Sequence, residues 1–94
     1  MSEFQDLAAE QRYEQAFGDS GTTGRVWADY ADSPGGRVIL HVEAEDALRG
    51  SGAAGKFMQR LADHARESGT WLVPRCSYAV AWFKRHPDQG DVLA

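Results

Sequence analysis

The chain has 94 residues, of which 43% are hydrophobic and 26% charged, and its formal net charge is −4. This length fits one small domain with a thin core, and the composition is that of a folded globular protein rather than a disordered chain. The acidic balance argues against a general binder of the nucleic acid backbone, because such proteins carry a basic excess.

Cys76 is the only cysteine, which excludes an intrachain disulfide and a cysteine-based zinc cluster. We therefore expect no metal site, and a lone thiol fits a reducing compartment. The opening Met1–Gln11 is polar and acidic, unlike a secretory leader, and the sequence has no run of about 18 apolar residues that would predict a membrane span. These features favour a cytoplasmic protein that binds neither membrane nor nucleic acid.

The first third of the sequence predicts an antiparallel meander. We expect Met1–Glu10 to be disordered or a frayed helical turn. Weak alternation over Tyr13–Phe17 and the apolar residues of Thr23–Tyr30 indicate two strands. Gly18–Gly21 is the predicted turn between them, and Ser33–Gly36 is a second turn that leads into the next strand.

The middle of the chain predicts a crossover from strand to helix to strand. Arg37–Val42 is a nearly continuous apolar run, which indicates a central strand covered on both faces. Ala53–Ala65 has a helical period, and Ser68-Gly69 is a typical helix end. Trp71–Val73 indicates a short buried strand. Because a helix joins the two strands, we expect them to run parallel through a right-handed crossover.

A second helix is expected from about Ser77, and Pro87 stops it. Lys84, Arg85 and His86 suit the negative end of its dipole, and His86 is expected to cap it. The predicted fold is therefore α/β, with a single-layer, mostly antiparallel sheet and one parallel βαβ crossover. We expect a single domain over residues 1–94.

The large aromatic residues allow two interpretations. Trp27, Trp71 and Trp82 are most simply residues of the core. Alternatively, Trp82 and Phe83 form an exposed surface through which the chain dimerises. The sequence leaves the oligomeric state open.

The segment Arg49–Lys56, which opens the first helix, has the composition of an anion site. A helix start presents unpaired N–H groups and the positive end of the dipole. Arg49 and Lys56 add positive charge. Small residues let a pyrophosphate approach the backbone, and they are Gly50, Ser51, Gly52, Ala53, Ala54 and Gly55. A flexible glycine turn without a ligand is the alternative interpretation.

Two nucleotide-binding patterns compete for this segment. Gly50–Lys56 fits the start of a P-loop, but Phe57 stands where a Ser or Thr hydroxyl must bind magnesium. Phe57 also falls on the apolar stripe of the helix, so we reject the P-loop. The acyl-CoA pattern R/Q-x-x-G-x-G/A is instead matched at all three fixed positions, by Arg49, Gly52 and Ala54.

Three features occur in order along the second half of the chain. They are His41-Val42-Glu43, the Arg49–Ala54 turn, and Val73–Tyr78 followed by Arg85-His86-Pro87. With these features, the stretch from Val38 to Leu93 resembles the small GNAT-like acetyltransferases, a minimal branch of the GNAT superfamily. The resemblance implies a protein that binds acetyl-CoA. Ser77 and the ending Asp88–Asp91 depart from the family pattern, which leaves the acceptor side open.

Candidate residues for acetyl transfer lie near both ends of the expected crossover. His41 and Glu43 follow the apolar strand, and either can act as a general base or hold one through water. Their structural alternatives are a hydrogen-bonded histidine and a solvated carboxylate. The resemblance implies that Cys76 faces the acetyl end of the cofactor, where it acts as a nucleophile or packs as a small hydrophobe. Tyr78 either protonates the leaving thiolate or packs.

The sequence thus predicts an acetyl-CoA-dependent N-acetyltransferase with Cys76, Glu43 and His41 at the reacting centre. Its acceptor is an unidentified amine, either a small molecule or a protein lysine. The alternative is a CoA-binding or protein-interaction module without turnover.

Overall fold

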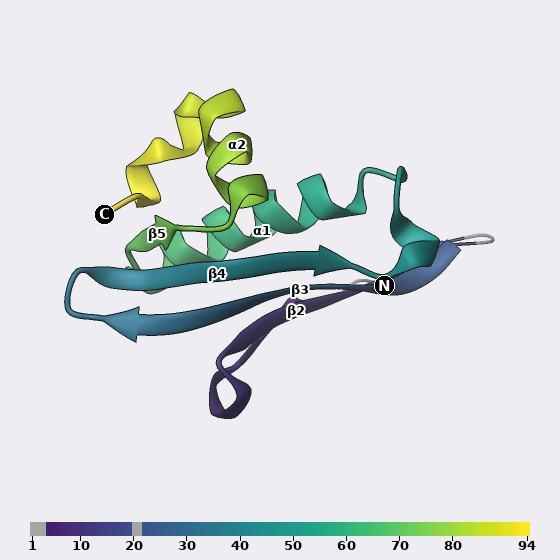
Figure 1. Ribbon diagram of the computed structural model, residues 1–94, viewed down its shortest axis with the longest axis horizontal. Helices are drawn as coiled ribbons and strands as arrows, with labels where there is room; N and C mark the ends of the chain where they lie inside the picture. The colour runs from purple at the N-terminus through teal and green to yellow at the C-terminus, as the bar shows by residue number, and fades with distance from the viewer. Residues whose placement is uncertain (1–3, 20–21) are drawn as a thin grey trace.

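The computed structural model describes residues 4–19 and 22–94, which form one sheet with two helices and three short 3-10 turns (Figure 1). The elements in order are β1 Phe4–Leu7, η1 Ala8–Glu10, β2 Arg12–Asp19, β3 Thr22–Ser33, β4 Gly36–Ala44, η2 Asp46–Leu48, α1 Ala53–Ser68, β5 Leu72–Pro74, α2 Ser77–Arg85 and η3 Pro87–Val92. The five strands follow the order β1-β2-β3-β4-β5, and only β4 and β5 are parallel. The predicted α/β fold with one parallel crossover is confirmed.

One face of the sheet carries the core. Val26 and Ala28 of β3 are fully buried, and their partners on β4 are Ala44 and Val42. These residues belong to the same hydrophobic cluster as the apolar stripe of α1, whose buried members are Ala53, Phe57, Met58, Leu61, Ala62 and Ala65. Because strand side chains alternate between faces, the intervening residues of β3 and β4 point away from α1.

Helix α1 has the boundaries that its glycines predict. It begins after Gly52 and ends at Ser68, and Gly69 follows in the left-handed conformation with a φ of 70°. The Gly69 N–H donates to the carbonyl of Ala65, which closes the last turn.

Strand β4 is not covered on both faces, and that expectation was wrong. The β3–β4 register shifts between Asp29 and Tyr30, whose partners are His41 and Ile39, so Leu40 is an extra residue in β4. Ile39 is fully buried, whereas the Leu40 side chain is 50% exposed. The apolar run lacks alternation because a β-bulge interrupts it.

Strands β4 and β5 pair over only three residues each. The ladder joins Arg37–Ile39 to Leu72–Pro74, and the N–H groups of Arg75 and Cys76 then both donate to the Ile39 carbonyl, at 3.0 and 3.2 Å. The chain turns there into α2, while β4 continues to Ala44. Within residues 4–19 and 22–94, no strand pairs with Leu40–Ala44 on the β5 side.

The opening of the chain also differs from the expectation. Phe4–Leu7 forms an edge strand on β2, and the Phe4 ring lies 5.6 Å from the ring of Phe57 on α1. A frayed or disordered opening is therefore wrong for residues 4–10. The expectation for Met1–Glu3 and the predicted turn residues Ser20-Gly21 lie outside the described residues.

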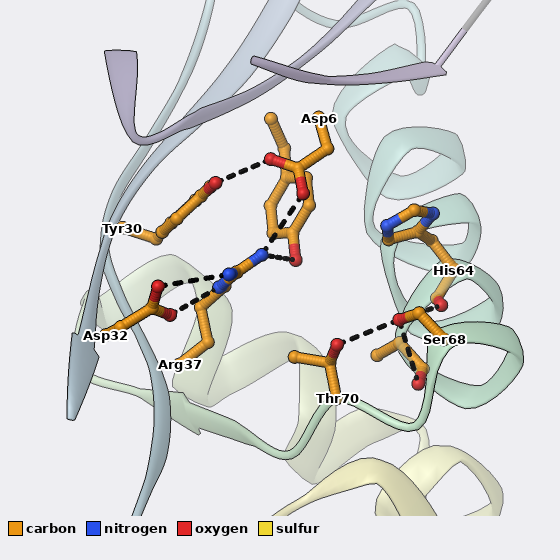
Figure 2. Close-up of polar contacts among 9 residues, drawn as sticks. Asp6, Tyr30, Asp32, Arg37, His64, Ser68 and Thr70 are labelled. Carbon is orange, nitrogen blue, oxygen red and sulfur yellow. Dashed lines mark hydrogen bonds and ion pairs between the residues drawn. The ribbon is translucent and has the colours of Figure 1, made fainter. Parts of the chain in front are cut away.

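The Arg37 side chain links β1 to the rest of the sheet by hydrogen bonds (Figure 2). Its guanidinium donates to Asp32 at 2.6 and 3.1 Å, to Asp6 at 3.2 Å and to the Tyr13 hydroxyl at 3.0 Å. It also lies 4.1 Å over the ring of Tyr30, whose hydroxyl donates to Asp6 at 2.5 Å. The hydrogen bond from Arg37 lowers the pKa of Asp32, and burial raises the pKa of both tyrosines. One cation thus joins four strands.

Helix α2 covers the end of the crossover. Trp82 and Phe83 are only 3% and 6% exposed and belong to the core, so Trp82 is the predicted core residue and the alternative of an exposed surface over these two residues is wrong. The Nδ1 atom of His86 lies 2.8 Å from the Trp82 carbonyl, which confirms that this histidine caps the helix.

The other tryptophans are not core residues. Trp71 precedes β5 and is 56% exposed, because Leu72 takes the inward position, and Trp27 lies half-buried on the face away from α1. Within the described ranges, no helix combines the length and apolar character that crossing a membrane requires.

Candidate functional site

The turn before α1 is built on two glycines with positive φ. Gly50 has a φ of 79° and Gly52 a φ of 85°, a conformation that residues with a Cβ adopt at a cost. A Cβ placed on either glycine meets nothing within 4 Å, so backbone conformation rather than space requires glycine here.

Some of the predicted N–H donors are already used inside this turn. The Ser51 N–H donates to the Leu48 carbonyl at 3.1 Å, and the Ser51 hydroxyl accepts from the Ala53 N–H at 3.2 Å. The first helical hydrogen bond runs from the Lys56 N–H to the Gly52 carbonyl at 3.2 Å. In the described part of the chain, the N–H groups of Ala54 and Gly55 have no acceptor. Of the predicted donors, the N–H groups of Ser51, Ala53 and Lys56 are thus occupied within the protein, and the anion site stays a prediction for the others.

Positive side chains flank these two N–H groups. Arg49 and Lys56 are both exposed. The Arg49 guanidinium lies 3.3 Å from a carboxylate oxygen of Asp46, and the two side chains are 66% and 94% exposed. Such an exposed pair holds its members weakly, so Arg49 can exchange Asp46 for a phosphate at little cost.

The structure brings the predicted residues His41 and Glu43 into contact. The His41 Nε2 atom lies 2.8 Å from the Glu43 Oε1 atom, and the side chains are 56% and 44% exposed. Their cross-strand partners are Asp29 and Trp27, so both point to the face of the sheet opposite α1. When Nε2 donates to Glu43, Nδ1 carries a lone pair that accepts a proton. The pair therefore has the chemistry of an oriented general base.

Cys76 contacts β4 through its backbone. It is the residue before α2, its side chain is half-buried against the core, and its N–H donates to Ile39. Among the described residues, no hydrogen bond or ion pair joins Cys76 to His41 or Glu43. Tyr78, two residues further on, has its pKa raised by burial.

Two features of this region were missed in the sequence. The bulge at Leu40 marks the point where β4 and β5 separate, and Trp27 lies beside Glu43 in the ladder. Alternation along Thr23–Tyr30 places Val26 and Ala28 inward, so that pattern contained the signal that Trp27 points outward. The described ranges contain no group of three or more His, Cys, Asp or Glu side chains placed to hold a metal ion.

A family described as GCN5-related N-acetyl-transferase matches residues 12–92, which run from the start of β2 to the end of η3 and include the turn before α1, the His41–Glu43 pair and Cys76. No curated protein gives a significant match to the chain. Because the match covers most of the sequence, the chain belongs to the GCN5-related N-acetyltransferase family.

Proposed function

We propose that this chain binds acetyl-CoA and transfers its acetyl group to an amine. One observation carries the proposal. Strand β4 separates from β5 after Ile39, and the edge of β4 that is then open runs from His41 and Glu43 to the anion site at the start of α1. Family membership supports the acetyltransferase chemistry, since members generally use acetyl-CoA.

The cofactor fits this path from end to end. Its pyrophosphate binds the N–H groups of Ala54 and Gly55, with Arg49 and Lys56 beside it. Its pantetheine arm carries two amides, which hydrogen-bond to the edge of Leu40–Ala44 as an added strand does. Four steps of extended strand span about 13 Å, and they place the thioester near the bulge at Leu40.

The transfer then needs one proton acceptor. His41, oriented by Glu43, takes a proton from the acceptor ammonium, and the neutral amine attacks the thioester carbon. The imidazolium passes this first proton to solvent. The C–N bond forms, the C–S bond breaks, and His41 takes the second proton from the acylated nitrogen and gives it to the departing CoA thiolate. The products are an acetylated amine and free CoA, and His41 returns to its neutral form.

Direct transfer is the route that the side-chain contacts favour. An acetyl-cysteine intermediate would need a base beside the Cys76 thiol, and the His41–Glu43 pair is not joined to it in the described residues. We therefore assign Cys76 to the wall of the thioester site. Its place as a lone thiol fits a reducing compartment, and the proposal includes a cytoplasmic location.

The test measures CoA thiol release with a panel of amines. Glu43→Gln and His41→Gln should lower kcat about 10²–10⁴-fold while acetyl-CoA still stabilises the variants. The matched control Glu67→Gln removes an exposed carboxylate from the far end of α1 and should keep full activity. Cys76→Ala should retain turnover.

Two results would contradict the proposal. Loss of turnover in Cys76→Ala with retained acetyl-CoA binding would establish the covalent route instead. Acetyl-CoA binding without thiol release beyond spontaneous hydrolysis, over the whole amine panel, would favour a CoA-binding module without turnover.

A further inference from the structure

A cavity opens beside the His41–Glu43 pair on the face of the sheet away from α1. Its volume is about 460 Å³, within the range of pockets that hold small ligands. It is lined by Thr23 and Trp27 of β3, by Glu43 and Ala44 of β4, and by Glu45, Asp46 and Ala47, which follow β4. Glu45 is joined to β3, because its Oε1 atom accepts the Arg25 N–H at 2.6 Å.

Trp27 gives this cavity an aromatic wall that already attracts a cation. The Arg12 guanidinium lies 5.3 Å from the centre of the Trp27 ring, and Arg12 is held in turn by Asp29 at 2.9 Å. An ammonium ion in the cavity would meet the same ring, since the electron-rich face of an indole attracts cations.

The charges around the cavity add to this preference. Its described lining holds the carboxylates of Glu43, Glu45 and Asp46 and has no Lys or Arg. The cationic partners lie outside the lining: Arg25 is 3.9 Å from Glu45, and Arg49 pairs with Asp46. The Arg49–Asp46 pair is exposed and therefore weak, so an ammonium ligand can take the place of Arg49 beside Asp46.

Two other acidic groups, Asp63 and Asp91, lack this setting. Asp63 and Asp91 are both engaged by the Arg66 guanidinium, at 3.2 and 2.7 Å. The cavity differs because an aromatic ring, a concave surface and carboxylates occur together, and because Glu43 belongs both to its wall and to the candidate base.

We propose that this cavity binds a small aliphatic diamine or polyamine as the acceptor. One nitrogen lies at His41 and Glu43, where it loses a proton and is acetylated. A second ammonium group lies between Trp27, Glu45 and Asp46 and positions the first. The acceptor role rests on the proposed acetyl transfer, whereas the binding of the polyamine does not require it.

The experiment titrates the full chain with spermidine, with n-butylamine and with a short lysine-rich peptide by calorimetry, in the absence of acetyl-CoA. Spermidine should bind more tightly than butylamine and should weaken as salt is raised. Asp46→Asn should weaken spermidine binding about three- to fivefold, and Trp27→Leu by a similar factor. Asp88→Asn removes an equal charge from the exposed η3 segment and should leave the affinity unchanged.

Each outcome decides the proposal. Equal affinity for spermidine and butylamine, no binding of spermidine, or equal weakening by Asp46→Asn and Asp88→Asn would overturn it. Binding of the peptide alone would also overturn it and assign the surface to a protein substrate. Asp46 is 94% exposed, so its variant keeps the fold even if Trp27→Leu does not. Spermidine binding in a chain that acetyl-CoA fails to stabilise would overturn the proposed function and the acceptor role, and would leave only the polyamine site.

Discussion

Two glycines at the start of α1 should respond in opposite directions to the same added methyl group. Gly52 has a φ of 85°, and its Cβ would meet nothing within 4 Å, so Gly52→Ala changes the backbone energy and not the packing. Alanine in the left-handed region costs about 1 kcal/mol. In a domain of 94 residues, this cost should lower the thermal midpoint by about 4–8 °C.

Gly55 is the matched control, three residues further along. It lies inside the first turn of α1, outside the positive-φ set, and its Cβ would also meet nothing within 4 Å. Alanine is the better helix former, so Gly55→Ala should raise the free energy of unfolding by about 0.5–1 kcal/mol.

The assay is thermal and urea unfolding of both variants without ligand, followed by circular dichroism. Opposite signs support the turn geometry. Destabilisation of similar size in both variants would refute the reasoning, because it would mean that added volume rather than backbone conformation controls this turn.

Three further predictions concern the Arg37 network and the cofactor site. Arg37→Met should lower the free energy of unfolding by about 2 kcal/mol, because the substitution leaves the carboxylate and hydroxyl partners of Arg37 unpaired. The thermal midpoint should therefore fall by about 8–16 °C, and a smaller fall than that of Gly52→Ala would contradict this. Burial raises the pKa of all three tyrosines above 10.0. Above pH 10 the unfolded chain therefore gives up phenol protons that the folded chain keeps, so the folded state loses stability and phenolate absorbance should rise only as the chain unfolds. Phenolate formation with unchanged circular dichroism would count against this. Arg49→Gln should weaken acetyl-CoA binding about three- to tenfold with unchanged unfolding in urea, whereas Lys84→Gln on α2 should not.

Local signals predicted the elements whose boundaries depend on backbone chemistry. The glycines on either side of α1 and the proline after α2 set the ends of both helices, and the sequence contains those residues at the observed positions. The acyl-CoA pattern likewise placed Gly52 where the backbone needs a positive φ.

Features that depend on distant partners were not accessible from the sequence. Strand β1 is short and polar, and it is fastened by Arg37, which lies 31 residues from Asp6. The bulge at Leu40 exists only relative to the register of β3, so the apolar run was misinterpreted as a strand buried on both faces. The same register brings Trp27 to Glu43, which composition and spacing do not indicate.

The candidate site also has features that the sequence predicted and features that depend on tertiary packing. The pattern of residues identified His41 and Glu43 one by one, and their 2.8 Å contact follows from both pointing to one face of β4. The sequence also ranked Cys76 with them. Its position on a separate element, half-buried against the core, depends on how α2 packs, which the sequence alone does not fix.

The most direct test of the account is the thermal midpoint of the purified protein with and without acetyl-CoA, with ATP–Mg as the control. At about a hundred times its dissociation constant, a ligand that binds only the folded state stabilises by about 2.7 kcal/mol. We expect the thermal midpoint to rise by about ten degrees or more with acetyl-CoA and not to rise with ATP–Mg. No rise with acetyl-CoA would contradict the central claim, and a rise with ATP–Mg alone would show that the rejected P-loop interpretation was correct.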